Sequence, residues 1–374
     1  MLHFEPGRPG QLPEILRFAN QAFTVNGKAE DFATLLPKLY APQAHSEPLH
    51  TLLYDGDALV GLFALHIQHC LVGGQRLKIG WIGTVSVAAQ ARGRGLLARL
   101  MGEANRLLDA NGCALGVLGG QRQRYAPFGY EYGGTQWLFT ITPRNLRGAV
   151  PNRDMTLAEW RPEVDLAAAY ALFLRQPLHL DRSPANFAAV LQSWNSRLFL
   201  IRHLGQDVGY VTLTPNGDVY ELLLELPQLL PGVLQALLPY TQGCLRLTLP
   251  PWAGPCHQVL AAICDQARLA ENHSYRVHDW PQVLNAALTL RQTCGLPLPG
   301  RSFSFMVKDG GAYRITGGPC PACRVVRRST GPLLPHHQAV RLLLGPDSAL
   351  VPAAALAPPG WLPLPFCLSW MDGI

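Results

Sequence analysis

Lysine is scarce in this sequence: Lys28, Lys38, Lys78 and Lys308 are the only lysines among its 31 basic residues. Charge of either sign is scarce too, since Asp, Glu, Lys and Arg make up 15% of the 374 residues and leave a formal net charge of +6. Low charge with 48% hydrophobic residues is the reverse of a disordered composition. Because the only dense basic run is Arg324–Arg328, we expect no nucleic-acid partner.

Long apolar runs are missing as well. No stretch reaches the ~20 apolar residues of a membrane span, and the start at Met1–Gly7 lacks the basic region and apolar core of a secretory signal. We therefore predict a cytoplasmic protein with no membrane partner. Nine cysteines, an odd number at irregular spacing, indicate reduced thiols. Cys320 and Cys323 form a lone Cys-x-x-Cys, and His336-His337 lacks the usual histidine spacing, so we predict no metal.

The length predicts two or three domains, at roughly 100–200 residues per domain. Hydrophobic periodicity predicts helices and an antiparallel three-strand meander in the first third. The elements expected there are helices at Leu12–Phe23 and Phe32–Tyr40, strands at Leu49–Tyr54, Leu59–Cys70 and Leu77–Val87, a helix at Leu96–Asn111 and a strand at Cys113–Leu118.

A polar, proline-containing segment at Pro143–Arg153 is a candidate linker, and the same order of elements recurs loosely after it. The expected elements are a helix at Leu166–Leu174, strands at Leu198–His203, Gly209–Thr214 and Asp218–Leu226, a helix at Val233–Tyr240, a strand at Leu245–Leu249 and a helix at Val259–Ala267. The last hundred residues predict a helix at Trp280–Leu290, strands at Ser302–Lys308 and Ala312–Thr316, and a proline-rich tail from Pro352 to Pro365.

The sharpest motif is Gln90–Gly95, which joins a predicted strand to a predicted helix. Gly93 and Gly95 allow successive backbone N–H groups to face one concavity, and the helix start adds partial positive charge, so the turn suits a phosphate. Arg92 and Arg94 add full charges. An ordinary turn with two solvated arginines is the alternative. The position after a meander and the lack of a third glycine argue against a dinucleotide site.

The loop Gln90-Ala91-Arg92-Gly93-Arg94-Gly95 resembles the pyrophosphate loop, Gln/Arg-x-x-Gly-x-Gly/Ala, of the GCN5-related N-acetyltransferases (GNAT). The order of meander, loop, helix and strand is also similar to that family. The resemblance implies an α+β fold of the α/β-type GNAT layout that binds acetyl-CoA as co-substrate. The cofactor-binding residues that it implies are Val85, Ser86, Val87, Arg92, Gly93, Arg94, Gly95, Leu96, Leu97, Ala98, Gly120 and Gln121.

A second segment, Tyr125–Tyr130, resembles the Tyr-x-x-Phe-Gly-Tyr/Phe stretch that follows the fifth strand in this family. The resemblance implies that Tyr125 lies by the thioester sulfur as a catalytic acid. Proton transfer from a neutral tyrosine to a thiolate is uphill by ~1.5 pKa units, or roughly 2 kcal/mol. A positioned tyrosine can perform that step. A tyrosine that caps a core is the alternative.

The layout of the whole chain resembles the Eis-type (enhanced intracellular survival) acetyltransferases. The matching segments are Arg94–Leu97, Tyr125–Tyr130, Asp265–Arg268 with Tyr275–Asp279, and the aromatic-rich end. The resemblance implies a catalytic GNAT domain at 1–145, a degenerate GNAT-like domain at 146–277 without a Gly-x-Gly loop, and a sterol-carrier-protein-like domain at 278–374. It also implies a homo-oligomer, with a hexamer favoured.

The Eis-type resemblance further implies that the terminal carboxylate, here that of Ile374, is the catalytic base. An α-carboxyl and an alkyl ammonium differ by about 7 pKa units, or ~9 kcal/mol. The step therefore needs burial or a bridging water. A terminus that is only docked on the surface is the alternative. Glu30, Asp31 and Asp372 are candidates for binding a cationic substrate, with solvated carboxylates as the alternative.

We therefore predict an acetyl-CoA-dependent N-acetyltransferase that acts on a primary amine of a small molecule or peptide by direct transfer. A backbone N–H near Val85 is expected to stabilise the oxyanion. The alternatives are a non-catalytic acyl-CoA-binding regulatory protein and a carrier of a hydrophobic ligand in the last domain.

Overall fold

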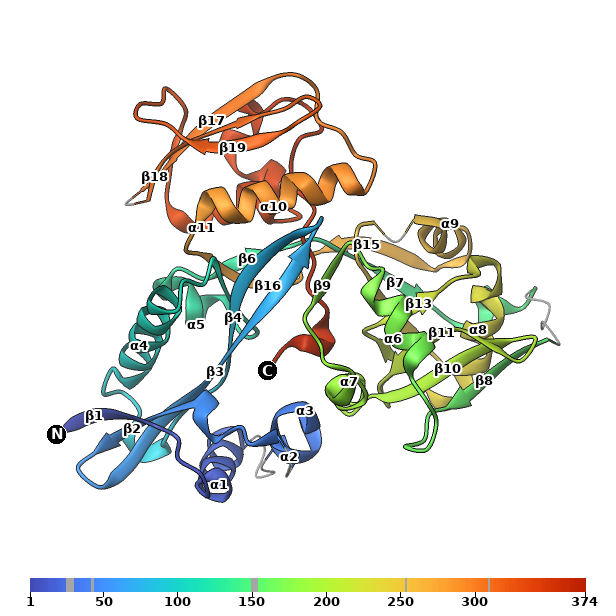
Figure 1. Ribbon diagram of the computed structural model, residues 1–374, viewed down its shortest axis with the longest axis horizontal. Helices are drawn as coiled ribbons and strands as arrows, with labels where there is room; N and C mark the ends of the chain where they lie inside the picture. The colour runs from blue at the N-terminus through green and yellow to red at the C-terminus, as the bar shows by residue number, and fades with distance from the viewer. Residues whose placement is uncertain (25–29, 42–43, 149–153, 253, 309) are drawn as a thin grey trace.

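The computed structural model describes residues 1–24, 30–41, 44–148, 154–252, 254–308 and 310–374. Its largest sheet has eight strands in the order β1-β2-β3-β4-β5-β16-β6, with β9 paired to β3 off this path (Figure 1). The strands are β1 (Leu2–Pro6), β2 (His50–Asp55), β3 (Ala58–Val72), β4 (Gln75–Val87), β5 (Leu115–Leu118), β6 (Glu131–Gly133), β9 (Leu178–Leu180) and β16 (His273–Val277). Only β4 and β5 run parallel among the described pairs of this sheet.

The predicted meander is confirmed as β2, β3 and β4. The predicted helix after the glycine loop is confirmed as α4 (Leu96–Ala110), which buries Leu96, Leu100 and Leu108 on one face of this sheet. A Cβ on Gly80 of β4 would lie 2.1 Å from the Leu108 side chain, so the absence of a side chain there lets α4 approach the sheet closely. Helix α1 (Leu12–Ala22) follows β1, as expected from its period.

The helix expected over Phe32–Tyr40 is wrong as one element. It is divided at Leu36 into α2 (Phe32–Leu35) and α3 (Pro37–Tyr40). Leu36 has φ −130° and ψ 63°, because a proline at the next position excludes the helical backbone there.

The middle of the chain builds two four-stranded sheets, in the orders β13-β11-β10-β8 and β12-β14-β7-β15. Their strands are β7 (Gln136–Ile141), β8 (Met155–Glu159), β10 (Arg197–His203), β11 (Gln206–Leu213), β12 (Asp218–Val219), β13 (Leu222–Leu224), β14 (Leu245–Leu249) and β15 (Gln266–Ala270). The helices are α6 (Ala167–Leu174), α7 (Pro184–Leu191), α8 (Leu230–Leu237) and α9 (Gly254–Ile263).

Two expectations in this region are wrong. The strand expected at Asp218–Leu226 is split, because β12 pairs with β14 and β13 pairs with β11 in the other sheet. The helix expected to reach Ala267 ends at Ile263, and the chain then turns into β15. Asp265 forms that turn, where its carboxylate accepts hydrogen bonds from Thr142 and Asn145.

The first two units exchange strands. Strand β7 leaves the large sheet and lies between β14 and β15, whereas β16 returns from the middle of the chain and lies between β5 and β6. The boundaries expected near residues 145 and 277 stay predictions. The exchange nevertheless places one strand of each unit beyond the boundary near residue 145: β16 belongs to the sheet of the first unit, and β7 belongs to a sheet of the second.

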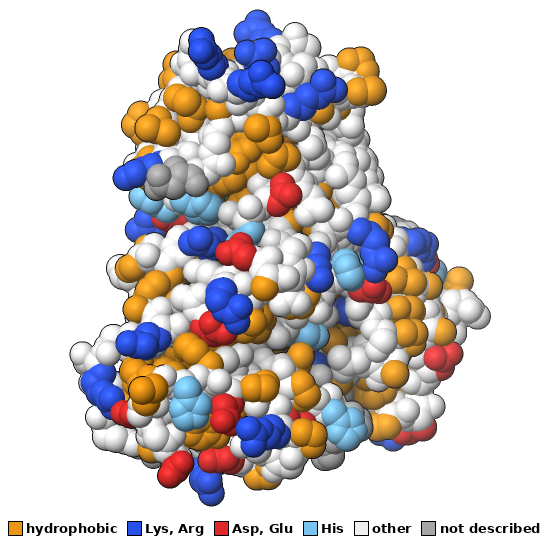
Figure 2. Space-filling view, turned by 60° about the vertical axis from the view of Figure 1, so that its left-hand side comes forward, with side chains coloured by type: hydrophobic (Ala, Val, Ile, Leu, Met, Phe, Trp, Pro, Cys, Tyr) orange, Lys and Arg blue, Asp and Glu red, His pale blue; other side chains and the backbone are white. Residues whose placement is uncertain are grey.

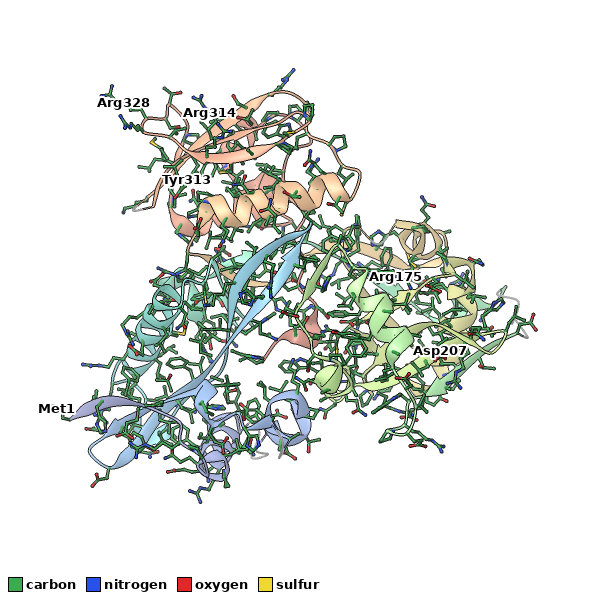
Figure 3. The ribbon with its side chains drawn as sticks, in the orientation of Figure 1. Met1, Arg175, Asp207, Tyr313, Arg314 and Arg328 are labelled. Atoms are coloured by element: carbon green, nitrogen blue, oxygen red, sulfur yellow. The ribbon has the colours of Figure 1, made fainter. Side chains whose placement is uncertain are left out.

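The last unit consists of α10 (Trp280–Thr293), a four-stranded sheet in the order β19-β18-β17-β20, and α11 (His336–Leu344). Its strands are β17 (Ser302–Val307), β18 (Gly311–Thr316), β19 (Ala322–Val325) and β20 (Leu333–Leu334). One hydrophobic core joins this unit to the face of the large sheet opposite α4. Lys and Arg side chains gather at its outer end (Figure 2), where Arg314 and Arg328 project away from the body (Figure 3).

After α11 the tail runs back into the molecule, and the C-terminus lies at its centre between the large sheet and the middle unit (Figure 1). The backbone N–H of Thr135 donates to the Phe366 carbonyl over 2.8 Å, and the N–H of Leu368 donates to Asn272 Oδ1 over 2.8 Å. Among the described residues, no helix combines the length and apolar character that crossing a membrane requires.

Candidate active site

A cavity of about 400 Å³ lies where β4 ends and α4 begins. Eight of the residues predicted to bind the cofactor line it, together with the predicted catalytic Tyr125: Val85, Ser86, Val87, Arg92, Gly93, Gly95, Leu96 and Leu97 from the strand, loop and helix. The structure therefore brings the two motifs together in one hollow, although Leu97 and Tyr125 are 28 positions apart in the chain.

The loop at this cavity has the backbone that its glycines allow. Gly93 and Gly95 have φ of 78° and 72°, in the left-handed region that other residues rarely adopt. Gly95 is the N-cap of α4, and no side chain caps the start of the helix. The first N–H groups of a helix and its dipole favour an anion, so this end of α4 suits a phosphate. A Cβ at either glycine would meet no described atom within 4 Å, so the loop faces open space.

Strand β4 carries a bulge beside this cavity. Its register places Leu62 opposite Ser86 and Ala64 opposite Gly83, so Thr84 and Val85 together face the single residue between them on β3. Thr84 has φ 53°, which is strained for a β-branched residue. Its hydroxyl lies 3.0 Å from the buried Tyr40 hydroxyl, and Ser86 Oγ donates to the Thr84 carbonyl over 2.8 Å. Such a bulge takes backbone groups out of the ladder, which leaves them available to a ligand.

Tyr125 ends the short helix α5 (Arg122–Tyr125) and is 7% exposed. Burial raises its pKa, so the phenol stays protonated at neutral pH. Gly120, with φ 126°, lies against the phenol ring, and a Cβ there would be 2.8 Å from the ring. Gly120 and the α5 N-cap Gln121 thus belong to the turn that positions Tyr125 and do not line the loop cavity.

The terminal carboxyl group lies against Gly83, two residues before Val85 on the same strand. A Cβ on Gly83 would be 2.4 Å from the carboxyl carbon of Ile374 and 2.6 Å from its side chain. The preceding Gly373 is buried near Trp81 of β4 and Trp194 of the middle unit. Since nothing larger than glycine fits at position 83, the sequence of β4 itself makes room for the terminus.

Lys38 holds the tip of the tail. Its buried ammonium group donates to the carbonyls of Met371 and Gly373, the latter over 2.6 Å. Burial lowers the pKa of Lys38 to about 7, against the opposing attraction of Asp372. The first unit thereby contributes a cation to the residues next to the terminus.

Arg182 holds the tail from the other side. Its buried guanidinium donates to both carboxylate oxygens of Asp372, over 2.8 and 3.0 Å, and to both oxygens of Glu221, over 2.9 and 2.8 Å. Tyr210 and Ser369 also donate to Glu221, over 2.6 and 2.5 Å. Burial would raise the pKa of Glu221, but Arg182 outweighs it and holds that pKa below its usual range. Breaking such a buried pair typically costs about 3–5 kcal/mol.

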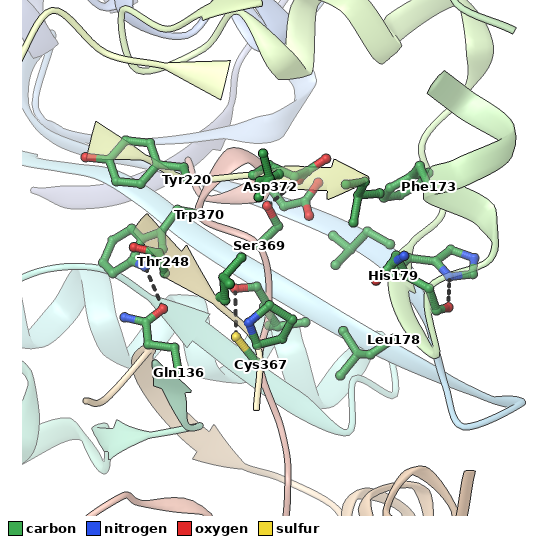
Figure 4. Close-up of a pocket in the computed structure, with 18 of the residues that line it drawn as sticks. Gln136, Phe173, Leu178, His179, Tyr220, Thr248, Cys367, Ser369, Trp370 and Asp372 are labelled. Atoms are coloured by element: carbon green, nitrogen blue, oxygen red, sulfur yellow. Dashed lines mark hydrogen bonds between the residues drawn. The ribbon is translucent and has the colours of Figure 1, made fainter. Parts of the chain in front are cut away.

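A smaller cavity lies where the tail meets the middle unit (Figure 4). Its volume is about 70 Å³, and Phe173, Tyr220 and Trp370 line it beside Asp372. Trp370 Nε1 donates to Gln136 Oε1 over 3.1 Å at its wall. The loop cavity, at about 400 Å³, is more than five times larger.

The comparisons with known proteins agree with this geometry. Residues 3–133 match the family model described as the acetyltransferase (GNAT) domain. This stretch is therefore similar to a GNAT domain. A comparison with curated protein sequences finds no match.

Solved structures resemble the chain over its whole length. A GCN5-related N-acetyltransferase from Kribbella flavida is 18% identical with a TM-score of 0.71, and the match covers 100% of this chain and 98% of that one. A GCN5-related N-acetyltransferase from Anabaena variabilis is 13% identical with a TM-score of 0.69, and Eis1 from Mycobacterium abscessus is 14% identical with a TM-score of 0.68; both matches cover 100% of each chain. These likenesses show the fold, a mixed α/β GNAT-like fold with several sheets.

Two residues predicted to bind the cofactor lie on the outside of the first unit. Arg94 pairs with Asp55 over 2.7 Å, and Ala98 is exposed on the first turn of α4. Neither lines the loop cavity.

The three carboxylates expected at the substrate are not together. Asp372 is buried in its pair with Arg182. Asp31 is exposed and caps α2, where it accepts hydrogen bonds from the Thr34 N–H and hydroxyl over 3.3 and 2.7 Å. Glu30 is exposed. The remainder of the loop from Phe23 to Asp31 includes residues 25–29, which lie outside the described residues.

The sequence motifs do not include the residues that place the terminus: Gly83, Lys38, Arg182 and Glu221. One signal was available for Lys38, a single lysine in the otherwise apolar stretch Leu35–Tyr40. Within the described residues, no cluster of three or more His, Cys, Asp or Glu has the arrangement of a metal site.

Proposed function

We propose that the protein transfers an acetyl group from acetyl-CoA to a primary amine of a small molecule or peptide, as an Eis-type enzyme. One observation carries the proposal. The terminal carboxyl lies at Gly83, on the strand whose next residues, Val85–Val87, line the cavity that Tyr125 closes. The proposed base and the proposed thioester site thereby lie along one strand, and the proposed acid, Tyr125, lines the same cavity from α5.

The loop at Gly93 and Gly95 binds the pyrophosphate, and the end of β4 holds the pantetheine and the thioester. The amine nitrogen attacks the thioester carbon, and a backbone N–H near Val85 stabilises the oxyanion that forms. The carboxylate of Ile374 removes a proton from the nitrogen, directly or through a water. The C–S bond then breaks, and Tyr125 gives its proton to the sulfur. No covalent enzyme intermediate is formed.

The remaining units support this site. The middle unit, a degenerate GNAT-like domain, supplies Glu221 and the walls around the tail, and the sterol-carrier-like last unit delivers the tail. In keeping with the Eis-type resemblance, we propose a cytoplasmic homo-oligomer, a hexamer by preference. Light scattering that gives the mass of a single chain at micromolar concentration would contradict the oligomer.

The decisive experiment compares the wild-type chain with one extended by two glycines after Ile374. Thiol release is followed with acetyl-CoA and a panel of polyamines, aminoglycosides and lysine peptides, and acetyl-CoA affinity is measured by calorimetry. We expect the extension to lower kcat on the best amine about 100-fold, with unchanged affinity and Tm. Equal kcat would show that the terminus is only docked. Binding of acetyl-CoA without turnover on any amine would favour a regulatory acyl-CoA-binding protein.

A further inference from the structure

Almost all of the net charge of this chain lies in one short stretch. Residues 299–334 contain six basic residues and one acidic residue, Asp309, and so carry +5 of the formal net charge of +6. The six are Arg301, Lys308, Arg314, Arg324, Arg327 and Arg328, and all are exposed. The stretch forms the sheet of the last unit, so the charge gathers at one end of the molecule (Figure 2).

The outer face of this sheet carries an unfavourable pair. The register places Ser304 opposite Arg314 and Arg314 opposite Arg324, so two guanidinium groups lie directly across from each other on β18 and β19. Like charges in this position destabilise a sheet. Arg314 Nε donates to Ser304 Oγ over 3.1 Å, and this hydroxyl carries no counter-charge. In the part of the chain that the structure describes, none of the six basic residues forms an ion pair.

An apolar side chain lies on the same face as the charged row. Leu333, opposite Met306 on this face, is 61% exposed. The three aromatic residues of the stretch, by contrast, are all buried on the inner side, as Phe303, Phe305 and Tyr313. A surface that combines cations with an exposed aliphatic side chain and offers no ring for base stacking fits a lipid headgroup layer better than a nucleic acid.

We propose that the outer face of the sheet β19-β18-β17-β20 docks on a membrane surface that contains anionic phospholipids. The phosphates and carboxylates of the headgroups neutralise the opposed Arg314 and Arg324, and Leu333 enters the interface. Arg328 projects from the same end as Arg314 (Figure 3). This inference departs from the expectation of no membrane partner. It concerns attachment to a surface and is independent of the catalytic proposal.

The test measures sedimentation of the full-length protein with vesicles of phosphatidylcholine alone or of equimolar phosphatidylcholine and phosphatidylserine. The variant is Arg314→Gln with Arg324→Gln. Since each basic residue at an anionic surface contributes several-fold to binding, we expect partition onto the mixed vesicles to fall roughly 30-fold. The control, Arg17→Gln with Arg147→Gln, removes the same charge from exposed positions elsewhere and should bind like wild type.

A second variant, Arg327→Gln with Arg328→Gln, changes two residues outside the strands. It should also weaken binding to the mixed vesicles, and it replaces the first variant if that one fails to fold. Tm of the first variant should stay the same or rise, because the like-charge pair is gone. Binding should also weaken at high salt. Equal partition of variant and control, or equal binding to vesicles of phosphatidylcholine alone, would overturn the proposal. Retention on a DNA duplex in place of vesicles, with the same arginine dependence, would overturn it in favour of nucleic acid.

Discussion

Gly83→Ala is the most direct test of the role of the terminal carboxylate. The new Cβ would lie 2.4 Å from the carboxyl carbon of Ile374, whereas ordinary van der Waals contact begins near 3.4 Å. The carboxyl group must therefore move by about 1 Å. Gly83 lies in β4 with φ outside the left-handed region, so alanine can adopt its backbone, and alanine is favoured over glycine in a strand by roughly 0.5–1 kcal/mol. The substitution thus moves the base without unfolding the strand.

A displacement of about 1 Å from the productive geometry costs on the order of 100-fold in rate. That factor corresponds to about 2.7 kcal/mol of activation free energy. We expect Gly83→Ala to lower kcat by this amount on the best amine, as measured by thiol release. The KM for acetyl-CoA should change little, because the loop at Gly93 and Gly95 is untouched.

Deletion of Ile374 supplies the control through a double-mutant cycle. The deletion alone should lower kcat strongly, and Gly83→Ala should then have almost no further effect, because the group that it displaces is gone. A full additional loss in the shortened chain would mean that Gly83→Ala damages the cofactor site itself. Wild-type kcat in Gly83→Ala would refute the base assignment.

Three further predictions concern Lys38, the glycine loop and Tyr125. The folded pKa of Lys38, about 7, lies below its ordinary value of 10.5, so the unfolded chain binds more protons between these values. The free energy of unfolding of the wild type, measured in urea, should therefore rise with pH across that window relative to Lys38→Met, by at most about 5 kcal/mol; parallel pH profiles would contradict this. Gly95→Asp should weaken acetyl-CoA binding in calorimetry at least about tenfold more than Gly95→Asn, since only the charge differs, and equal affinities would remove the pyrophosphate from this loop. Tyr125→Phe should lower kcat about 100-fold with little change in the KM for acetyl-CoA, whereas wild-type kcat would exclude it as the acid.

The elements of the first unit were predictable because their signals are local. The turn residues at Asp55–Asp57 and Gly73-Gly74 and the alternation of the strands are enough to predict the meander. The loop cavity followed from one contiguous motif at Gln90–Gly95. Local sequence patterns did not predict the strands correctly where pairing with distant segments decides the structure. Asp218–Leu226 looks like one strand, but its two halves pair with strands of different sheets.

The sequences of β7 and β16 do not predict which sheet each strand joins. Both are ordinary apolar strands, and their place depends on which sheet offers an open edge. Strand β16 pairs with β5 and β6, from which it is separated by more than 130 residues. Since pairing energy is similar for any strand of suitable pattern, the sequence indicates that such strands exist without indicating their neighbours.

The residues around the terminus show the same limit at the level of the site. Lys38 contacts residues 333 and 335 positions away, and Arg182 contacts Asp372 across 190 positions. Each is an unremarkable basic residue in its own segment. Lys38 and Arg182 contact the tail only after the three units have folded and the tail lies between them. A buried charge is then costly unless its partner is in place. The terminal carboxylate can therefore be placed at β4 only in the complete chain.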